Sequence, residues 1–144
     1  MLELRPVAGE RELSDPAVTG AFAQEMSALA ATPQVPPWCG YIGWRDTVPV
    51  GFGGFTSAPD PSGVVEVGYL TFPVYEHTGV ASAVCAGLVA IARSSGATVL
   101  IAHTLASEGP STRVLSKCGF TRDGVAIDPD EGEVWRWRLV LAPV

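Results

Sequence analysis

Residues 64–82 read VVEVGYLTFPVYEHTGVAS, and this stretch decides the fold of the chain. The apolar segment Val64–Phe72 predicts a strand, and Gly79–Arg93 predicts a helix that begins directly after a short loop. A loop that opens into a helix directs several backbone N–H groups to one place, at the positive end of the helix dipole. Such a place binds phosphate without a particular side chain. The stretch therefore predicts a ligand that carries a phosphate or pyrophosphate.

Signals on either side of this stretch predict the element order β-α-β-β-β-α-β-α-β-β. A helix begins at Ser14–Pro16, and another begins at Pro110 and ends before Gly119. Ala97–His103 is an apolar segment typical of a central strand. The other predicted strands are Leu2–Val7, Cys39–Arg45, Val48–Thr56, Phe120–Val125 and Glu133–Leu141. The predicted fold class is α/β (α+β), with a single mixed, mostly antiparallel sheet flanked by helices in one domain over residues 1–144.

Three glycines in the predicted strand Val48–Thr56 are many for a strand. They indicate either a β-bulge or a place where another backbone packs closely.

Composition narrows the class of protein and its partners. The chain has 144 residues and a net charge of −6 without a basic stripe, so nucleic acid is not expected as a partner. It has no apolar run of the ~20 residues that a membrane span needs, and its start does not resemble a secretory signal. Three cysteines and two histidines lack the spacing of a zinc site, so no metal is expected. We therefore expect a reduced cytoplasmic protein.

Two motifs resemble those of the GNAT superfamily of acyl-CoA-dependent N-acyltransferases. Residues 66–69 read EVGY and lead into PVYEHTGVA at 73–81, and residues 108–120 read EGPSTRVLSKCGF. Both motifs are similar to those of the branch that acetylates N-terminal amines of ribosomal proteins. Two positions depart from that pattern, because Glu76 stands where arginine or glutamine is usual and Glu108 where asparagine is usual.

The resemblance implies acetyl-CoA, or another acyl-CoA, as co-substrate and a set of contacts for it. The loop and helix start would cradle the pyrophosphate through the backbone of His77, Thr78, Gly79, Val80, Ala81 and Ser82. Glu108 stands where the family places a contact to the pantetheine arm; the alternative is an acid that caps a surface helix. For the glycine loop the alternative is a simple strand-to-helix turn.

Where two strands splay apart in this family, the backbone of Leu70, Thr71 and Phe72 would hold the pantetheine arm and polarise the acyl carbonyl. The alternative at these three residues is continuous pairing with the next strand.

Acetyl transfer needs a neutral amine and a proton for the departing thiolate. Ser111 matches the family serine near the coenzyme sulfur and is the predicted proton donor, unless its hydroxyl only bonds backbone at the helix start. Glu66 is the predicted base, directly or through water, unless it is a solvated residue on the open face of the sheet. A lone histidine such as His103 is more often structural than catalytic. Trp38 either walls the acceptor site or belongs to the core.

The predicted function is acetyl-CoA-dependent N-acetylation by direct transfer to a primary amine, in a small molecule or at a protein N-terminus. The alternative is a non-catalytic GNAT-like protein that binds acyl-CoA, which the substitutions at Glu76 and Glu108 favour. The sequence does not select the acceptor, and it is compatible with a monomer or a homodimer. Cys85 and Cys118 lie on apolar helix faces and are expected to serve packing.

Overall fold

A computed structural model describes residues 2–6, 36–46, 48–56, 58–71 and 79–141. The described elements are β1 (Leu2–Pro6), β2 (Gly40–Arg45), β3 (Val48–Phe55), β4 (Val64–Thr71), α4 (Val80–Ser94), β5 (Val99–Leu105), α5 (Pro110–Lys117), β6 (Thr121–Asp128) and β7 (Gly132–Val140). The helix predicted to begin at Ser14–Pro16 lies outside the described residues. The described elements follow one another along the chain in the predicted order.

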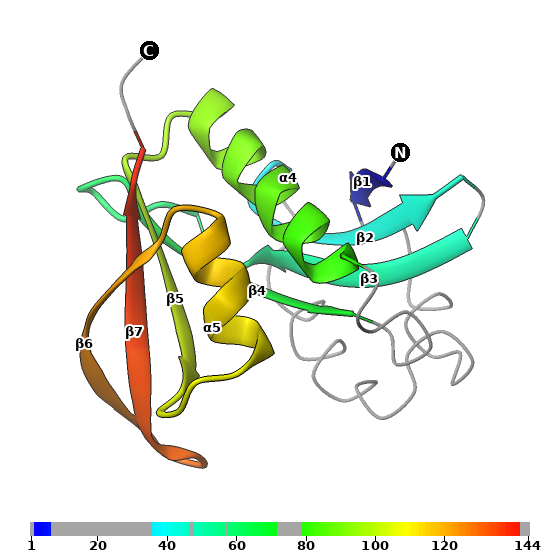
Figure 1. Cartoon of the computed structure of the whole chain (residues 1–144). Helices are drawn as coiled ribbons and strands as arrows, with labels where there is room; N and C mark the ends of the chain where they lie inside the picture. The colour runs from blue at the N-terminus through cyan, green and yellow to red at the C-terminus, as the bar shows by residue number, and fades with distance from the viewer. Residues whose placement is uncertain (1, 7–35, 47, 57, 72–78, 142–144) are drawn as a thin grey trace.

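The described strands form one mixed sheet in the order β1-β2-β3-β4-β5-β7-β6 (Figure 1). Only the contact between β4 and β5 is parallel among these neighbouring pairs, and the others are antiparallel. This arrangement confirms the predicted single, mostly antiparallel sheet. Helix α4 is the crossover connection between the two parallel strands.

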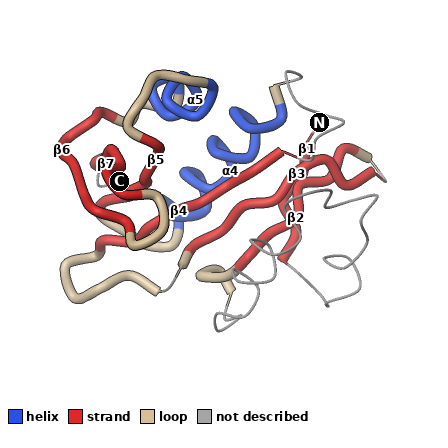
Figure 2. Tube along the Cα trace, turned by 90° about the horizontal axis from the view of Figure 1, so that it is seen from below, coloured by secondary structure: helices blue, strands red, loops and turns tan. Residues whose placement is uncertain are grey.

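Both described helices cover the same side of the sheet (Figure 2). The core lies between them and the strands, and it includes Val84 and Leu88 of α4, Leu115 of α5 and Leu100 of β5. Neither helix in the described part of the chain is long and apolar enough to cross a membrane.

Glycines in β3 allow α4 to approach the sheet closely. A Cβ atom on Gly53 would lie 2.8 Å from Val84 Cγ1 and 2.9 Å from Leu88 Cδ1, closer than side-chain carbons pack. The register of β2 and β3 also shifts at Gly43/Trp44, opposite Gly51. A Cβ atom on Gly54 would lie 2.7 Å from the backbone oxygen of Cys39, so another backbone also packs closely here. Both interpretations of the glycine-rich strand are therefore confirmed.

The structure corrects several predicted element boundaries. β5 begins and ends two residues later than predicted. β6 extends to Asp128, three residues beyond the predicted end, and the intervening turn is correspondingly short. The carboxylate of Asp128 accepts the N–H groups of Asp130 at 2.8 Å and Glu131 at 2.9 Å. These two hydrogen bonds hold the turn, so residues that resemble a loop by composition end a strand.

Candidate active site

The strands β4 and β5 diverge soon after they meet (Figure 1). Their parallel ladder joins Val64–Glu66 to Val99–Ile101 and goes no further, although β4 continues to Thr71 and β5 to Leu105. We call this divergence the fork. Beyond Glu66 the backbone of β4 still pairs with β3 but has no ladder partner on β5, so the N–H and C=O groups on its β5 side can bind something else. The alternative of continuous pairing between these strands is therefore wrong.

Helix α4 begins at the end of the loop that follows β4. Gly79 precedes the helix with φ 83° and ψ 5°, a left-handed conformation that glycine adopts at little cost. The first turn of α4 contains no acidic residue. Its first N–H groups lack acceptors inside the helix and carry the positive end of the dipole. Among the described residues, no atom would lie within 4 Å of a Cβ on Gly79.

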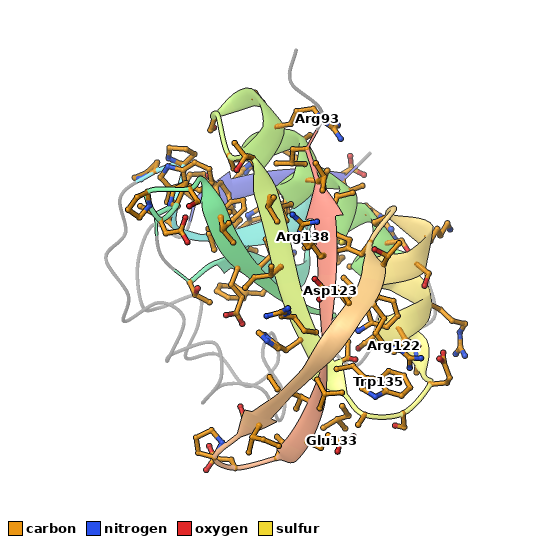
Figure 3. All side chains as sticks on the ribbon, turned by 90° about the vertical axis from the view of Figure 1, so that its left-hand side faces the viewer. Arg93, Arg122, Asp123, Glu133, Trp135 and Arg138 are labelled. Carbon is orange, nitrogen blue, oxygen red and sulfur yellow. The ribbon has the colours of Figure 1, made fainter. Side chains whose placement is uncertain are left out.

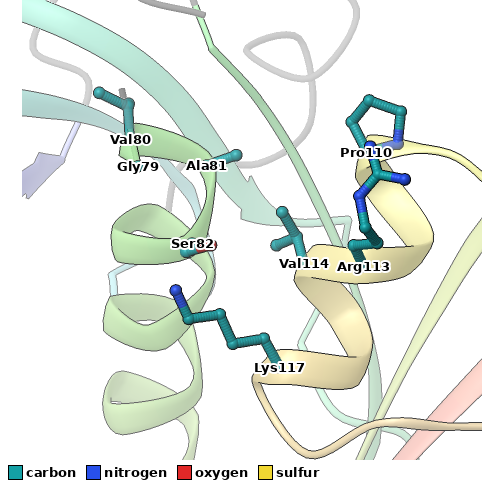
Figure 4. Close-up of a pocket in the computed structure, with 8 residues that line it drawn as sticks. All are labelled: Gly79, Val80, Ala81, Ser82, Pro110, Arg113, Val114 and Lys117. Carbon is teal, nitrogen blue, oxygen red and sulfur yellow. The ribbon is translucent and has the colours of Figure 1, made fainter. Parts of the chain in front are cut away.

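A groove of about 230 Å³ lies between the start of α4 and one face of α5 (Figure 4). It is lined by Gly79, Val80, Ala81, Ser82, Pro110, Arg113, Val114 and Lys117. Lys117 reaches from α5 towards Ser82, and Arg113 extends along α5 towards Pro110 (Figure 4). Two cations and a helix N-terminus therefore face the groove, and none of the eight lining residues is acidic. An anionic group bound here gains favourable electrostatic energy from both helices.

A second cavity of about 350 Å³ continues the groove along the two helices. It shares Ser82 and Lys117 with the first and adds Arg93 and apolar atoms of Ala86 and Val89. The charge beside α4 is therefore positive over two adjoining cavities.

The start of α5 is held by the side chain of Thr112. The Thr112 hydroxyl accepts the N–H of Gly109 at 3.0 Å, and it lies 3.0 Å from the carboxylate of Glu108, to which it can donate. Thr112 is 2% exposed, whereas Ser111 beside it is exposed. Glu108 thus takes part in the polar contacts that begin the helix, as the alternative interpretation of this residue expected.

On the face of the sheet away from the helices, Glu66 and His103 meet at the fork. Glu66 Oε2 lies 3.2 Å from His103 Nδ1, and both side chains are partly exposed. Val65 and Val67 are buried on the helix side, so the alternation of β4 places Glu66 on the opposite face. Figure 3 looks onto this part of the sheet, where Arg138 and Asp123 are labelled. Glu66 lies on the open face of the sheet, as the alternative interpretation of this residue expected, but a side-chain partner holds it there.

Comparisons with known proteins agree with this geometry. A model of the acetyltransferase (GNAT) domain matches residues 6–121. The chain belongs to the GNAT acetyltransferase family. This confirms the predicted family, the enzyme class and acyl-CoA as co-substrate. No curated protein matches this GNAT acetyltransferase in sequence.

Solved structures share the fold of this GNAT acetyltransferase at low identity. The ribosomal-protein-S18-alanine N-acetyltransferase of Escherichia coli has a TM-score of 0.74 and 12% identity, with 100% of this chain and 96% of that chain covered. An aminoglycoside acetyltransferase in complex with coenzyme A has a TM-score of 0.70 and 16% identity, with 97% and 95% covered. A spermidine N-acetyltransferase chimera from Vibrio cholerae and hSSAT has a TM-score of 0.72 and 11% identity, with 97% and 95% covered. These likenesses confirm the predicted fold.

The predicted site residues are distributed over several parts of this GNAT acetyltransferase. Gly79, Val80, Ala81 and Ser82 all line the groove, as the cradle requires, whereas Ser111 is not among its lining residues. The backbone of Leu70 and Thr71 lies on β4 past the last pair of the fork. Phe72, Glu76, His77 and Thr78 lie outside the described residues.

Trp38 packs its ring edge-to-face on Phe55, with ring centroids 5.1 Å apart. Phe55 is 1% exposed and belongs to the core, so Trp38 contributes to packing at this point. Cys85 is buried in the core and Cys118 packs against it, as their apolar helix faces predicted. In the described residues no group of three or more His, Cys, Asp or Glu side chains could hold a metal ion.

Three features of the site were missed in the sequence. Arg113 and Lys117 belong to the quoted motif, but only their spacing of four residues on one helix face indicates that both would line one surface. The contact of His103 with Glu66 joins residues 37 positions apart. No local pattern signals such a contact, because it depends on the register of two parallel strands.

Proposed function

We propose that this GNAT acetyltransferase transfers an acetyl group from acetyl-CoA directly to a primary amine, as one domain over residues 1–144. The observation that carries the proposal is the position of the cationic groove beside the fork. One end of a long coenzyme can then bind between α4 and α5. Its other end reaches the edge of β4 that has no partner on β5 beyond Glu66.

The residues of the groove fit the phosphate end of acetyl-CoA. The N–H groups of Gly79–Ser82 would bind the pyrophosphate, together with the side chains of Arg113 and Lys117. The backbone of Leu70 and Thr71 would bind the pantetheine arm, with Phe72, His77 and Thr78 completing the set. Acetyl-CoA supplies the activated acetyl group, and the residues of the protein orient that group.

Four further residues complete the proposed site. Ser111, in the first turn of α5, would donate a proton to the departing thiolate. Glu66 would help to remove a proton from the acceptor amine at the fork. Glu108 lies just before α5, where the family contacts the pantetheine arm. Trp38 would border the acceptor through the edge of its ring that does not pack on Phe55.

Direct transfer is supported by the raised pKa values of two cysteine thiols. Burial raises the pKa of the Cys85 thiol, and the neighbouring Cys118 raises it further. Burial also raises the pKa of Cys39, although a hydrogen bond with Tyr41 lowers it in part. Because the thiolate and not the thiol is the nucleophile, neither group is suited to accept an acetyl group from acetyl-CoA.

The acceptor is proposed to be a cationic amine in the reduced cytoplasm, either a small molecule or a protein N-terminus. The net charge of −6 favours approach of such a cation. Proteins of the same fold include a spermidine N-acetyltransferase chimera, an aminoglycoside acetyltransferase and a ribosomal-protein-alanine N-acetyltransferase. All three cysteines are free thiols, which suits a reducing compartment. A monomer and a homodimer both remain compatible with this proposal.

Thermal unfolding with and without acetyl-CoA tests the coenzyme site. A ligand at ~100 times its dissociation constant stabilises the folded state by about 2.7 kcal/mol, which for a domain of this size raises Tm by roughly 5–10 °C. Lys117→Ala and Arg113→Ala should each weaken binding about 10-fold, the size of one charge-assisted hydrogen bond. Arg122→Ala is the matched control, because Arg122 lies over the Trp135 ring and outside the groove.

Thiol release from acetyl-CoA across a library of amines and peptides tests the transfer itself. Release that depends on an acceptor supports the enzyme. A clear rise in Tm without release for any acceptor would favour the non-catalytic acyl-CoA-binding protein. No rise in Tm at millimolar acetyl-CoA, together with no heat of binding, would exclude both.

A further inference from the structure

The contact between Glu66 and His103 stands at the point where the sheet opens. Glu66 is the last residue of β4 paired with β5, and His103 lies two residues beyond its partner Ile101. Their side chains bridge the two strands just where backbone pairing stops, with Oε2 and Nδ1 3.2 Å apart. A polar pair at this position is adjacent to any group that occupies the fork.

The pair and the cationic groove lie on opposite faces of the sheet. The groove is formed by α4 and α5, which cover one face, whereas Glu66 and His103 project from the other. A coenzyme bound on the helix side leaves the second face accessible. An amine that approaches the fork from that face can reach this pair, because both side chains are partly exposed.

The carboxylate determines which imidazole nitrogen is basic. Ionised Glu66 can only accept a hydrogen bond, so His103 Nδ1 carries the proton of this contact. In the neutral imidazole Nε2 then holds the free electron pair. A histidine anchored in this way by a carboxylate presents one defined proton acceptor.

We propose that His103 Nε2 takes the proton from the ammonium group of the acceptor, and that Glu66 is the residue that positions the imidazole. This inference rests on the proposed function. It moves the role of base from Glu66 to His103, because Glu66 already accepts a hydrogen bond and Nε2 has no hydrogen-bond partner among the described residues.

The proton balance of the reaction is complete. Nε2 accepts one proton from R–NH3⁺, which leaves a neutral R–NH2, and returns that proton to solvent after turnover. The amine nitrogen forms a bond to the acetyl carbonyl carbon, and the bond from that carbon to the thioester sulfur breaks. The second amine proton ends on the departing sulfur. The products are the acetamide, the free thiol of coenzyme A and one proton.

Other charged groups surround this face and take part in its titration. In the β5–β7 register Arg136 lies opposite His103 and Arg138 opposite Ile101. Arg136 is already engaged, since its Nε lies 3.0 Å from Asp123 Oδ1 of β6. From β4, Glu66 contributes the carboxylate in direct contact.

Asp128 at the end of β6 is the remaining acid near this face. The N–H groups of Glu131 and Asp130 lower the pKa of Asp128, and the charge of His103 lowers it further. Asp128 is therefore ionised throughout the pH range in which a histidine titrates.

The first experiment is the pH dependence of kcat/KM on an acceptor identified by the library. The wild-type enzyme should lose activity at low pH as a single group is protonated, which gives the pH profile an acidic limb. His103→Ala should lower the rate at neutral pH about 100-fold, lose this acidic limb and regain activity when free imidazole is added. Glu66→Gln should lower the rate less and move the limb to lower pH, because a negative charge beside the imidazolium is removed.

Two controls separate this role from a structural one. Glu133→Gln removes an exposed carboxylate from β7 and should change neither the rate nor the limb. His103→Ala should leave the rise in Tm on addition of acetyl-CoA unchanged, because the coenzyme binds on the other face. Loss of that rise would show that the variant has damaged the fold or the coenzyme site.

A second readout does not depend on turnover. The chain has two histidines, so the His103 signal in a proton NMR titration is identified by its loss in His103→Ala. Glu66→Gln should move the midpoint of that titration to lower pH. An unmoved midpoint would overturn the pairing, and an acidic limb retained at full rate in His103→Ala would overturn the role of proton acceptor. If wild-type protein binds acetyl-CoA but transfers to no acceptor, the proposed function fails and this inference fails with it.

Discussion

Gly79 is the residue on which the phosphate site most depends. Its φ of 83° suits glycine, and no atom of the described residues would lie within 4 Å of a Cβ there. Gly79→Ala should therefore cost about 1 kcal/mol of stability through backbone strain alone. Gly79→Asp should cost a similar amount and also place a negative charge at the start of α4, which opposes an anionic ligand.

Calorimetric titration with acetyl-CoA measures the difference between these two variants. We expect Gly79→Asp to bind at least 10-fold more weakly than Gly79→Ala, with the gap narrowing at high salt because the charge acts through a screened field. Equal affinities for the two variants would place the phosphates elsewhere.

Ser111 and Thr112 are adjacent hydroxyl residues with different expected roles. Thr112 is buried and bonds the start of α5, so Thr112→Ala should cost about 1 kcal/mol of unfolding free energy. If Ser111 protonates the thiolate, Ser111→Ala should lower kcat about 100-fold, with coenzyme affinity nearly unchanged. Full turnover of Ser111→Ala, with chemistry shown to limit the rate, would remove Ser111 from the mechanism.

At this scale the sequence predicted backbone roles better than side-chain partners. Gly79 and Gly119 were placed correctly because a left-handed turn at a helix end leaves a local signature. The positions of Arg113 and Lys117 in the groove and the contact between Glu66 and His103 were not predicted, because each depends on elements that are distant in sequence. Glu108 illustrates the limit of motif transfer, because its nearest partner is the Thr112 hydroxyl of its own helix start.

Among the elements, α4 depends on the glycines beneath it. Gly53→Ala would place a methyl group 2.8 Å from Val84 and 2.9 Å from Leu88, so the helix must shift. We expect a loss of about 1–3 kcal/mol in unfolding free energy, as is usual for overpacking. Coenzyme binding should also weaken, because the start of α4 moves with the helix.

Gly68→Ala is the matched control on the neighbouring strand. A Cβ on Gly68 would meet no atom of the described residues within 4 Å, so the same added methyl group should leave stability within about 0.5 kcal/mol of wild type. Denaturant unfolding of the two variants measures the difference. An equal loss in both would mean that the closeness of α4 does not account for the effect.

Element types were predictable because their periodicity is local, whereas some of their ends were not. β5 runs two residues past the expected His103 because Thr104 and Leu105 pair with Trp135 and Val134 of β7. Such an extension is fixed by the partner strand and leaves no mark in the sequence of β5 itself.

For the whole molecule, the fork divides the sheet into two antiparallel blocks, β1–β4 and β5–β7–β6. The ladder between them contains three residue pairs. A coenzyme bound across both blocks should suppress local opening at their junction. Hydrogen exchange should therefore show increased protection of the amides of Val99–Ile101 on addition of acetyl-CoA, beyond the increase in the β2–β3 hairpin. Uniform protection throughout the sheet would argue against binding across the fork.

The short ladder also determines how the chain can reach its native state. Three antiparallel pairs, β2 with β3, β3 with β4 and β6 with β7, are hairpins between elements adjacent in the chain, and these contacts close small loops. The parallel ladder forms only after the crossover through α4 has brought residues 64 and 99 together. Because pairing over a long loop is slow, we expect the hairpins to form first, and the junction between the blocks to form later, along with the β1–β2 and β5–β7 pairs that also join distant residues.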